Sequence, residues 1–366
     1  MVYKDVTQCV GCGMCAVVCP VKCLDIKLNE KGFYVPYLNP NIECINCKKC
    51  VSICPQFMEC KEVEPKKIFS VVSKDDEVLK TSSSGGICYE LGKKAIELNR
   101  EVCGCVYDYK NNIAVHRIIN NIEDLEETKG SKYFQSYTVD AYVNLFDGTP
   151  KIVFGSPCQI AAIDAYAKKR KIRENLVLVD FFCHGTPSMK LWHKYLKEHN
   201  EKEIKKIEFR SKEAGWHNFS LKFNYIDGNE ISDSNKNMFY RYFFDNQCLN
   251  NSCYSCKFKA NKSYADIRVG DFWGNKYRNN TSGVSCCVAF TKLGVDTLNE
   301  IADRCIFDLE NFEDVMEEQM YNSPKKKKLR KVVFWSLNNK RTLKENYDTI
   351  FLPYRIWSKL KSMIRR

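Results

Sequence analysis

Two stretches of the chain repeat one spacing of cysteines, C-x2-C-x2-C-x3-C-P. The first is CVGCGMCAVVCP at residues 9–20, and the second is CINCKKCVSICP at residues 44–55. Three closely spaced thiolates can sit on one tight loop around an iron–sulfur cubane. The fourth must come from elsewhere, because the proline turns the chain away. The spacing therefore predicts two 4Fe-4S clusters.

The fourth cysteine of each run is expected to cross to the other cluster, as in two-cluster ferredoxins. Zinc ribbons and disulfides are the alternatives, but zinc sites rarely use two identical four-cysteine runs that each end in proline. We expect a ferredoxin-type domain over residues 1–62, with a charged linker, KEVEPKK, at 61–67. The two predicted ligand sets are Cys9, Cys12, Cys15 and Cys54, and Cys44, Cys47, Cys50 and Cys19.

Four more cysteines lie where a third metal site is expected. Residues 151–199 alternate strand, helix, strand and helix, which favours an α/β layer with parallel strands. Cys158 follows the first strand and Cys183 ends the second, and ligands gather at the C-terminal ends of such strands. Cys253 and Cys256 add a C-x2-C pair. The four predict a third four-thiolate site, which zinc could occupy as well as a 4Fe-4S cluster.

A turn of small residues opens a predicted helix after the linker, in TSSSGGICYELGKKAIELN. Small residues expose backbone N–H groups at a helix start, where the positive end of the helix dipole suits a phosphate or pyrophosphate. An ordinary serine N-cap is the alternative. Lys132, after a glycine turn, could pair with a phosphate, and a solvated surface lysine is the alternative. The small residues are Ser83, Ser84, Gly85 and Gly86.

Length and composition limit the class of protein. At 366 residues the chain is too long for a ferredoxin alone, and two or three domains are expected. No apolar signal segment opens MVYKDVTQ, and no run approaches the length of a membrane span. The 21 cysteines therefore indicate a reducing, cytoplasmic compartment rather than a disulfide scaffold, and they favour an oxygen-poor cell, that of an anaerobe.

The net charge of +12 is concentrated at one end of the chain. Residues 321–366 hold fourteen Lys and Arg residues against Glu345 and Asp348, so residues 1–320 are neutral and nucleic acid is disfavoured as a partner. In RIWSKLKSMIRR the apolar residues fall on one helical face with basic residues around it. This pattern predicts an interfacial helix and peripheral contact with the inner face of the membrane. Packing on the protein's own body or on a partner subunit is the alternative.

Six motifs in the body of the chain resemble a known family, the coenzyme F-420 hydrogenase/dehydrogenase beta subunit family. In chain order they are SSGG, KGSKY, GSPCQIAA, FCHGTPS, FRSKEAGW and the pair CYSCKF with DIRVGDFWG. The similarity covers about residues 68–300. It implies a mixed α/β fold, with a flavin-binding part at 68–150, a C-terminal part with the third cluster at 151–320, and a basic tail at 321–366 that the family does not explain.

Members of this family are iron–sulfur flavoproteins, and the resemblance implies cofactor sites. It favours a 4Fe-4S cluster over zinc at Cys158, Cys183, Cys253 and Cys256, and it gives the additional Cys248 no ligand role. Bacterial relatives with a fused ferredoxin unit are associated with cell-surface polysaccharide pathways. The implied FAD site includes Ser83, Ser84, Gly85, Gly86, Lys132 and Tyr133.

We therefore expect an iron–sulfur flavoprotein oxidoreductase that takes electrons from a low-potential donor such as ferredoxin. The three clusters would pass single electrons to FAD, which can also move hydride, for reduction of a small-molecule or lipid-linked substrate. Hydride exchange between FAD and coenzyme F-420 is one alternative, and a non-catalytic relay subunit of a larger complex is another. His184 and Asp271 are the candidates for an acid or a base.

Overall fold

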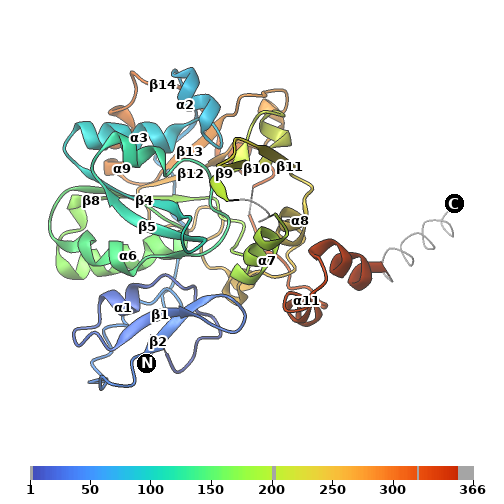
Figure 1. Cartoon of the computed structure of the whole chain (residues 1–366). Coiled ribbons are helices and arrows are strands. Elements are labelled where there is room, and N and C mark those ends of the chain that lie inside the picture. The colour runs from blue at the N-terminus through green and yellow to red at the C-terminus, as the bar shows by residue number, and fades with distance from the viewer. Residues whose placement is uncertain (1–2, 200–202, 320, 353–366) are drawn as a thin grey trace.

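The structure is a computed structural model that describes residues 3–199, 203–319 and 321–352. Within these residues, nine strands form one mixed sheet in the order β14-β3-β13-β12-β8-β7-β4-β5-β6 (Figure 1). Strands β4, β7, β8 and β12 run parallel to one another, whereas β13, β3 and β14 continue the sheet by antiparallel pairing. Their bounds are β3 (Lys67–Ser73), β4 (Glu101–Asp108), β5 (Ile113–Ile119), β6 (Ser136–Tyr137), β7 (Lys151–Phe154), β8 (Leu176–Phe181), β12 (Ile267–Asp271), β13 (Ser285–Ala289) and β14 (Cys305–Leu309).

Helices cover both faces of this sheet, and the apolar run of its central strands follows from that arrangement. In β8, Val177 and Val179 pack on the face that carries α3 and α9, whereas Leu176 and Leu178 pack on the face that carries α6. The first face is covered by α2 (Asp76–Thr81), α3 (Ile87–Glu97), α4 (Ile122–Glu126) and α9 (Lys292–Asn299), and the second by α5 (Val139–Tyr142), η1 (Val143–Phe146), α6 (Pro157–Arg170) and η2 (Arg173–Asn175).

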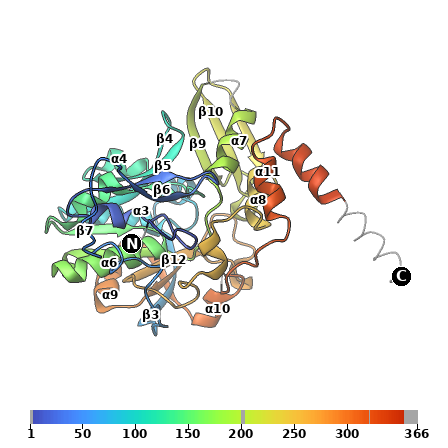
Figure 2. The same cartoon turned by 90° about the horizontal axis from the view of Figure 1, so that it is seen from below.

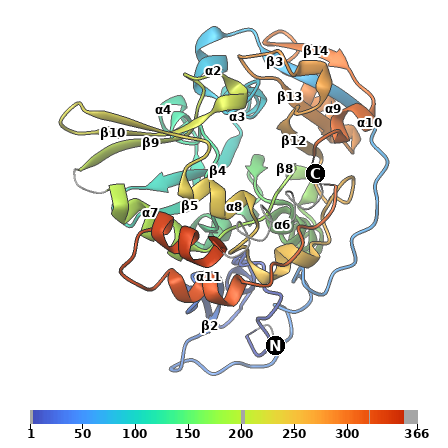
Figure 3. The same cartoon turned by 90° about the vertical axis from the view of Figure 1, so that its right-hand side faces the viewer.

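The N-terminal domain lies against the α6 face of the sheet (Figures 1 and 2). It contains α1 (Met14–Val17) and an antiparallel hairpin of β1 (Leu24–Leu28) and β2 (Tyr34–Leu38). Met14 and Ile53 are buried in the same core as side chains of α6, so the two parts share one apolar contact. The chain then runs along the outside of the molecule to β3 (Figure 3), where the N–H of Val63 donates to the carbonyl of Asn261 at 3.1 Å.

A second lobe has an aromatic core and projects from the side of the large sheet (Figure 3). Its antiparallel sheet has the order β11-β10-β9, and Trp192, Phe209, Phe223 and Tyr240 are among its buried side chains. Helical residues from the C-terminal region, including Phe334 of α11, complete this core. The lobe contains α7 (Met189–His199), β9 (Ile204–Ser211), η3 (Trp216–Asn218), β10 (Ser220–Tyr225), β11 (Glu230–Ser234), α8 (Met238–Phe244) and α11 (Arg330–Ser336).

The predicted mixed α/β fold with an N-terminal ferredoxin-like part is confirmed, and β7, α6 and β8 form the predicted parallel unit. Helix α7 differs from that pattern, because its apolar face is buried in the aromatic lobe rather than on the large sheet. Strands from residues 68–150 and from 151–320 share the one large sheet, so residue 150 does not separate two cores. The remaining short helices are η4 (Asn251–Ser255), η5 (Asn275–Tyr277) and α10 (Phe312–Met316).

The basic tail is described as far as residue 352. Val333, Phe334 and Leu337 are buried against the aromatic lobe, and so are Leu343 and Tyr347 in the helical turns at 343–352. The predicted amphipathic helix around residues 355–366 lies outside the described residues. No helix in the described part of the chain combines the length and apolar character needed to cross a bilayer.

Candidate functional site

The first predicted ligand set comes together beside α1. Burial, together with the nearby charge of Cys54, raises the pKa of Cys9 to about 11. The charge of Cys54 also raises the pKa of Cys12 and of Cys15, so all four thiols are neighbours. Gly11 shapes the loop with φ +71°, and its N–H donates to the Sγ of Cys9 at 3.4 Å. The set consists of Cys9, Cys12, Cys15 and Cys54.

The second predicted set lines one cavity at the outer end of the N-terminal domain. Its members are Cys19, Cys44, Cys47 and Cys50, and Cys47 is exposed to solvent. The buried thiol of Cys23 joins this cavity, with its Sγ 3.4 Å from that of Cys19. Cys23 lies outside the repeated spacing, so the motif gave no indication of it.

The third set comes together at the C-terminal edge of the large sheet. Cys158 is in the first turn of α6 after β7, Cys183 follows β8, and Cys253 and Cys256 belong to and follow η4. Burial raises the pKa of Cys158 well above its usual value, and the charges of Cys183 and Cys256 add to this effect. The charge of Cys253 likewise raises the pKa of Cys183. Among the described residues, no three His, Cys, Asp or Glu side chains converge on a position for a single metal ion.

Backbone N–H groups and a hydroxyl lie within hydrogen-bonding distance of sulfurs of the third set. The N–H of Thr186 donates to the Sγ of Cys253 and the N–H of Phe258 to that of Cys256, each at 3.4 Å. The hydroxyl of Ser156 lies 3.3 Å from the Sγ of Cys158. Hydrogen bonds of this kind stabilise thiolate ligands and tune the metal centres they hold.

Cys248 does not join this set. Its side chain is fully buried in the aromatic core, close to Tyr242 and to the charge of Arg330. Burial raises the pKa of Cys248 to about 12. Its surroundings are therefore those of a core thiol.

The three sets form a row in which each set adjoins the next. The charge of Cys50 in the second set raises the pKa of Cys15 and of Cys54 in the first set, so these thiols are neighbours. The charge of Cys12 in the first set likewise raises the pKa of Cys158 in the third set. The first set therefore lies between the exposed second set and the third set at the edge of the sheet.

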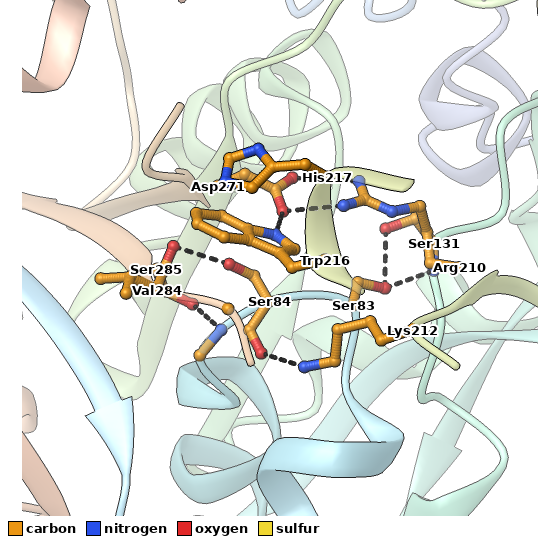
Figure 4. Close-up of polar contacts among 12 residues, drawn as sticks. Ser83, Ser84, Ser131, Arg210, Lys212, Trp216, His217, Asp271, Val284 and Ser285 are labelled. Carbon is orange, nitrogen blue, oxygen red and sulfur yellow. Dashed lines mark hydrogen bonds and ion pairs between the residues drawn. The ribbon is translucent and has the colours of Figure 1, made fainter. Parts of the chain in front are cut away.

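The Ser-Gly turn is held between β13 and the loop at 129–133 (Figure 4). Its two serine hydroxyls and one glycine N–H all have partners within the protein. The hydroxyl of Ser84 donates to the carbonyl of Val284 at 2.8 Å, the N–H of Gly85 donates to the hydroxyl of Ser285 at 2.9 Å, and the hydroxyl of Ser83 accepts from the N–H of Ser131 at 3.1 Å.

The two glycines of the turn are required by packing and by backbone conformation. A Cβ at Gly85 would lie 2.1 Å from the carbonyl oxygen of Val71. Gly86 has φ +90° and is itself the N-cap of α3, with no side-chain cap. The helix therefore does not begin with the serine N-cap that was the alternative. Its first turn carries Cys88, whose side chain is exposed to solvent.

Lys132 does not face the Ser-Gly turn in this structure. Its ammonium donates to the carbonyls of Glu127, Thr128 and Lys129, each at 3.0 Å, and so caps the C-terminal end of α4. Burial lowers the pKa of Lys132 to about 8. Lys132 is thus a capping lysine rather than a solvated surface lysine, and its contact with a phosphate stays a prediction.

Lys212 supplies a positive charge beneath the turn instead. Its ammonium donates to the carbonyl of Ser84 at 3.0 Å and also to the carbonyls of Leu79 and Ser282 (Figure 4). Burial, together with the charge of Arg210, lowers the pKa of Lys212 to about 8. Lys212 lies in the FRSKEAGW motif, but the sequence indicated no role for it, because only the fold brings residue 212 to residue 84.

Asp271 is engaged by several donors. Its carboxylate accepts from the Arg210 guanidinium at 3.1 and 3.2 Å and from the indole N–H of Trp216 at 2.8 Å (Figure 4). The same guanidinium donates to the hydroxyl of Tyr133 at 3.1 Å. Trp216 in turn stacks on Trp273, with ring centroids 5.3 Å apart. Asp271 and Tyr133 therefore belong to one network centred on a buried arginine.

His184 has a separate environment beside the third cysteine set. Its Nε2 lies 2.7 Å from the Oδ1 of Asn246, and its ring packs edge-on against Phe243. Burial, together with the charge of Lys259, lowers the pKa of His184 to about 4. The imidazole is therefore neutral at ordinary pH. The structure does not bring His184 and Asp271 into one acid–base pair.

The chain matches two family models. The model for the 4Fe-4S dicluster domain matches residues 8–58, and the model for the C terminus of the coenzyme F420 hydrogenase/dehydrogenase beta subunit matches residues 151–315. Residues 151–315 contain the C-terminal domain of the coenzyme F420 hydrogenase/dehydrogenase beta subunit family. The resemblance stated from the six motifs is thereby confirmed, and a 4Fe-4S dicluster domain precedes that domain in the chain.

Known proteins similar to this chain match either its N-terminal domain or most of its fold. An uncharacterized ferredoxin of Methanocaldococcus jannaschii is 42% identical over 68 residues, which is 18% of this chain and 84% of the relative. Ferredoxin-3 of Nostoc is 38% identical over 65 residues, 14% of this chain and 67% of the relative. A chain of the F420-reducing NiFe hydrogenase complex from Methanosarcina barkeri has a similar fold, with a TM-score of 0.50, 18% identity, and coverage of 80% of this chain and 94% of that chain.

Proposed function

We propose that this chain is an iron–sulfur flavoprotein oxidoreductase with three 4Fe-4S sites and one FAD site. The observation that carries the proposal is the row of three four-cysteine sets, which begins at the exposed Cys47 and ends at Cys183 on the edge of the large sheet. When bound, the clusters supply one-electron transfer and FAD supplies the exchange of electron pairs and hydride. A row of closely spaced sites suits transfer from a donor at the surface to chemistry in the interior.

The residues of each set fit a cubane. The two ferredoxin-type sets have the family spacing, and each combines three cysteines of one run with the last cysteine of the other. The third set takes one cysteine from each of two strand ends and a pair from η4, so that its four sulfurs come from three directions. The backbone N–H groups of Thr186 and Phe258 donate to two of its sulfurs. This surrounding of thiols by hydrogen-bond donors supports an anionic metal centre there.

The Ser-Gly turn fits the diphosphate of FAD. Helix α3 begins at Gly86 without a side-chain cap, so the N–H groups of its first turn and the helix dipole are available to an anion. Lys212 and Arg210 place two positive charges near the same turn. In this proposal Ser83, Ser84, Gly85 and Gly86 form the diphosphate site. Lys132 supports it by capping the chain after α4, and Tyr133 by its contact with Arg210.

His184 and Asp271 have positioning roles in this account. Asp271 orients the buried Arg210, which contacts the loop that carries Tyr133. His184 is neutral and follows Cys183 directly, so it shapes the turn beside the third set. The proton for substrate reduction must therefore come from another group or from water.

Two other functions share these sites. Hydride exchange between FAD and coenzyme F-420 is the first, and it is favoured by the family whose C-terminal model matches residues 151–315. A relay subunit of a larger assembly is the second, and it is favoured by the similar fold of a chain in a multi-subunit hydrogenase complex. A substrate in cell-surface polysaccharide metabolism stays a prediction of the resemblance. Reoxidation of the reduced chain by F-420, by candidate substrates, or by neither separates these functions.

The cofactor content of the full chain, purified without oxygen, tests the proposal. We expect about twelve irons, four for each of three cubanes, together with one FAD and no zinc. About eight irons with one zinc would make the third set a structural zinc site. Twelve irons without any flavin would leave the relay function and remove the flavoprotein.

A further inference from the structure

Lys259 is a buried lysine at the third cysteine set. Its residue is 8% exposed, and its neighbours Phe258 and Ala260 are also buried. The ammonium donates to the carbonyl of Cys183 at 2.5 Å and to that of His184 at 3.3 Å. It therefore sits inside the turn that presents Cys183.

No carboxylate in the described part of the chain forms an ion pair with Lys259. Two other buried cations of this region are paired, since Arg268 meets Asp180 at 2.7 Å and Arg210 meets Asp271 at 3.1 Å. A buried charge without a counter-charge is strongly disfavoured. Carbonyl oxygens satisfy the hydrogen bonds of Lys259 but do not neutralise it.

The groups that can supply the missing negative charge are the thiolates of the third set. The charge of Lys259 acts on both Cys183 and Cys253, which places the ammonium close to two of the four sulfurs. A cubane with four thiolates is an anion, and it gains one more negative charge when it is reduced. A cation fixed in a low-dielectric site favours that more negative form.

We propose that Lys259 is the counter-charge of the third cluster and raises its reduction potential. This inference rests on the proposed function, in which the third set holds a 4Fe-4S cluster. A higher potential at the inner end of the row makes electron transfer from the ferredoxin-type clusters toward the interior favourable. The charge of Lys259, rather than its packing, performs this role.

Three single variants of the full chain separate charge from packing. Lys259→Gln keeps a hydrogen-bond donor for the two carbonyls and removes the charge. Lys259→Arg keeps the charge. Lys257→Gln removes the same charge two residues away, where the exposed ammonium contacts the carbonyls of Gln56 and Met58 and acts on Cys54 of the first set rather than on the third set.

The measurement is a redox titration of each variant, followed by the low-temperature electron paramagnetic resonance of the reduced clusters, with iron content determined on the same samples. For Lys259→Gln we expect the full content of about twelve irons. The reduced-to-oxidised ratio of one cluster, measured at a fixed potential, should fall at least tenfold, which corresponds to a fall of about 59 mV in its one-electron reduction potential. Lys259→Arg and Lys257→Gln should leave the reduction potential of that cluster unchanged.

Each other outcome has a definite meaning. Three unchanged potentials in Lys259→Gln with full iron content would overturn the inference and leave the three-cluster function intact. If Lys259→Gln loses four irons, Lys259→Arg decides, because a charge role requires the arginine variant to retain the cluster and a loss there too would make the lysine a packing residue. An unmodified chain with only about eight irons would refute the proposed function itself.

Discussion

Cys12 and Cys158 lie close together across the contact between the N-terminal domain and the large sheet. Burial raises the pKa of Cys158, and the charge of Cys12 is one of the neighbouring charges that add to it. Met14 and Ile160 are buried in the core that joins the two sides. The ferredoxin-type domain is therefore packed so that its first cysteine set adjoins the third set, and the contact itself becomes a part of the function.

Gln135 holds this contact in register. It is 5% exposed, its Oε1 accepts from the N–H of Tyr34 at 2.9 Å, and its amide donates to the carbonyl of Val10 at 2.8 Å. Gln135→Ala would leave two backbone groups of the N-terminal domain without partners. We expect a loss of about 2 kcal/mol in the free energy of unfolding, measured by denaturant titration.

The same variant should slow flavin reduction by a ferredoxin-level donor, because the first and third sets would be less firmly placed. Asn144→Ala is the matched control, since its amide contacts one backbone carbonyl at the exposed end of α5. Unchanged stability and an unchanged reduction rate in Gln135→Ala would show that apolar packing alone positions the domain.

Lys212 is expected to make FAD binding depend on pH. Its pKa is lowered to about 8, so its charge is lost as the pH rises from 7 to 9. The affinity for the FAD diphosphate should therefore fall above pH 8, by up to about tenfold per pH unit. Lys212→Arg should keep FAD and remove this pH dependence, because a guanidinium stays protonated in that range. Release of FAD, followed by its fluorescence, gives the affinity at each pH.

Lys212→Met should lose FAD at neutral pH and retain the ferredoxin-type clusters. Lys205→Met, at an exposed position on β9, the strand that ends at Ser211 just before Lys212, is the matched control. Retention of stoichiometric FAD with unchanged affinity in Lys212→Met would place the diphosphate elsewhere in the molecule.

The C-terminal region is expected to contact anionic lipid through residues beyond 352. Truncation must leave the buried side chains of Phe334, Leu343 and Tyr347 in place, because they belong to the aromatic core. We expect the full chain to sediment with phosphatidylserine vesicles at low salt and a chain ending at residue 352 to remain in solution. Equal binding by both forms would assign the predicted helix to protein contacts.

Trp335 is a second candidate for contact with the membrane surface. Its side chain is 71% exposed on α11, next to the basic stretch at 325–331. If the truncated chain still binds vesicles, Trp335→Ser in that truncated form should reduce the binding. Aromatic side chains with one polar edge are favoured at the membrane interface, and the surrounding lysines add electrostatic attraction.

The ferredoxin-type ligand sets could be predicted from the sequence because their geometry is local. Cys9, Cys12 and Cys15 lie on one loop, and the crossing of Cys54 follows from a rule about the repeated motif. The third set required a second argument, that cysteines after parallel strands meet at one edge of the sheet. The placement of Cys158 and Cys183 agrees with that argument.

Contacts between distant segments could not be predicted in this way. The ion pair between Arg210 and Asp271 and the hydrogen bond from Lys212 to Ser84 depend on how the aromatic lobe meets the large sheet. Lys132 was expected near a phosphate, but the short helix α4 ends beside it and offers three carbonyls. Spacing gives ligands that are close in the chain, whereas charges beneath a turn come from the tertiary fold.

The iron content of two cysteine variants tests the central claim most directly. In Cys183→Ser, where serine is a poor ligand for cluster iron, we expect about eight irons instead of about twelve and much slower flavin reduction by a ferredoxin-level donor, with FAD retained. In Cys248→Ser, which changes a buried core thiol, we expect the full iron content and the unmodified reduction rate. Full iron content and an unmodified rate in Cys183→Ser, together with the loss of both in Cys248→Ser, would contradict the assigned third set.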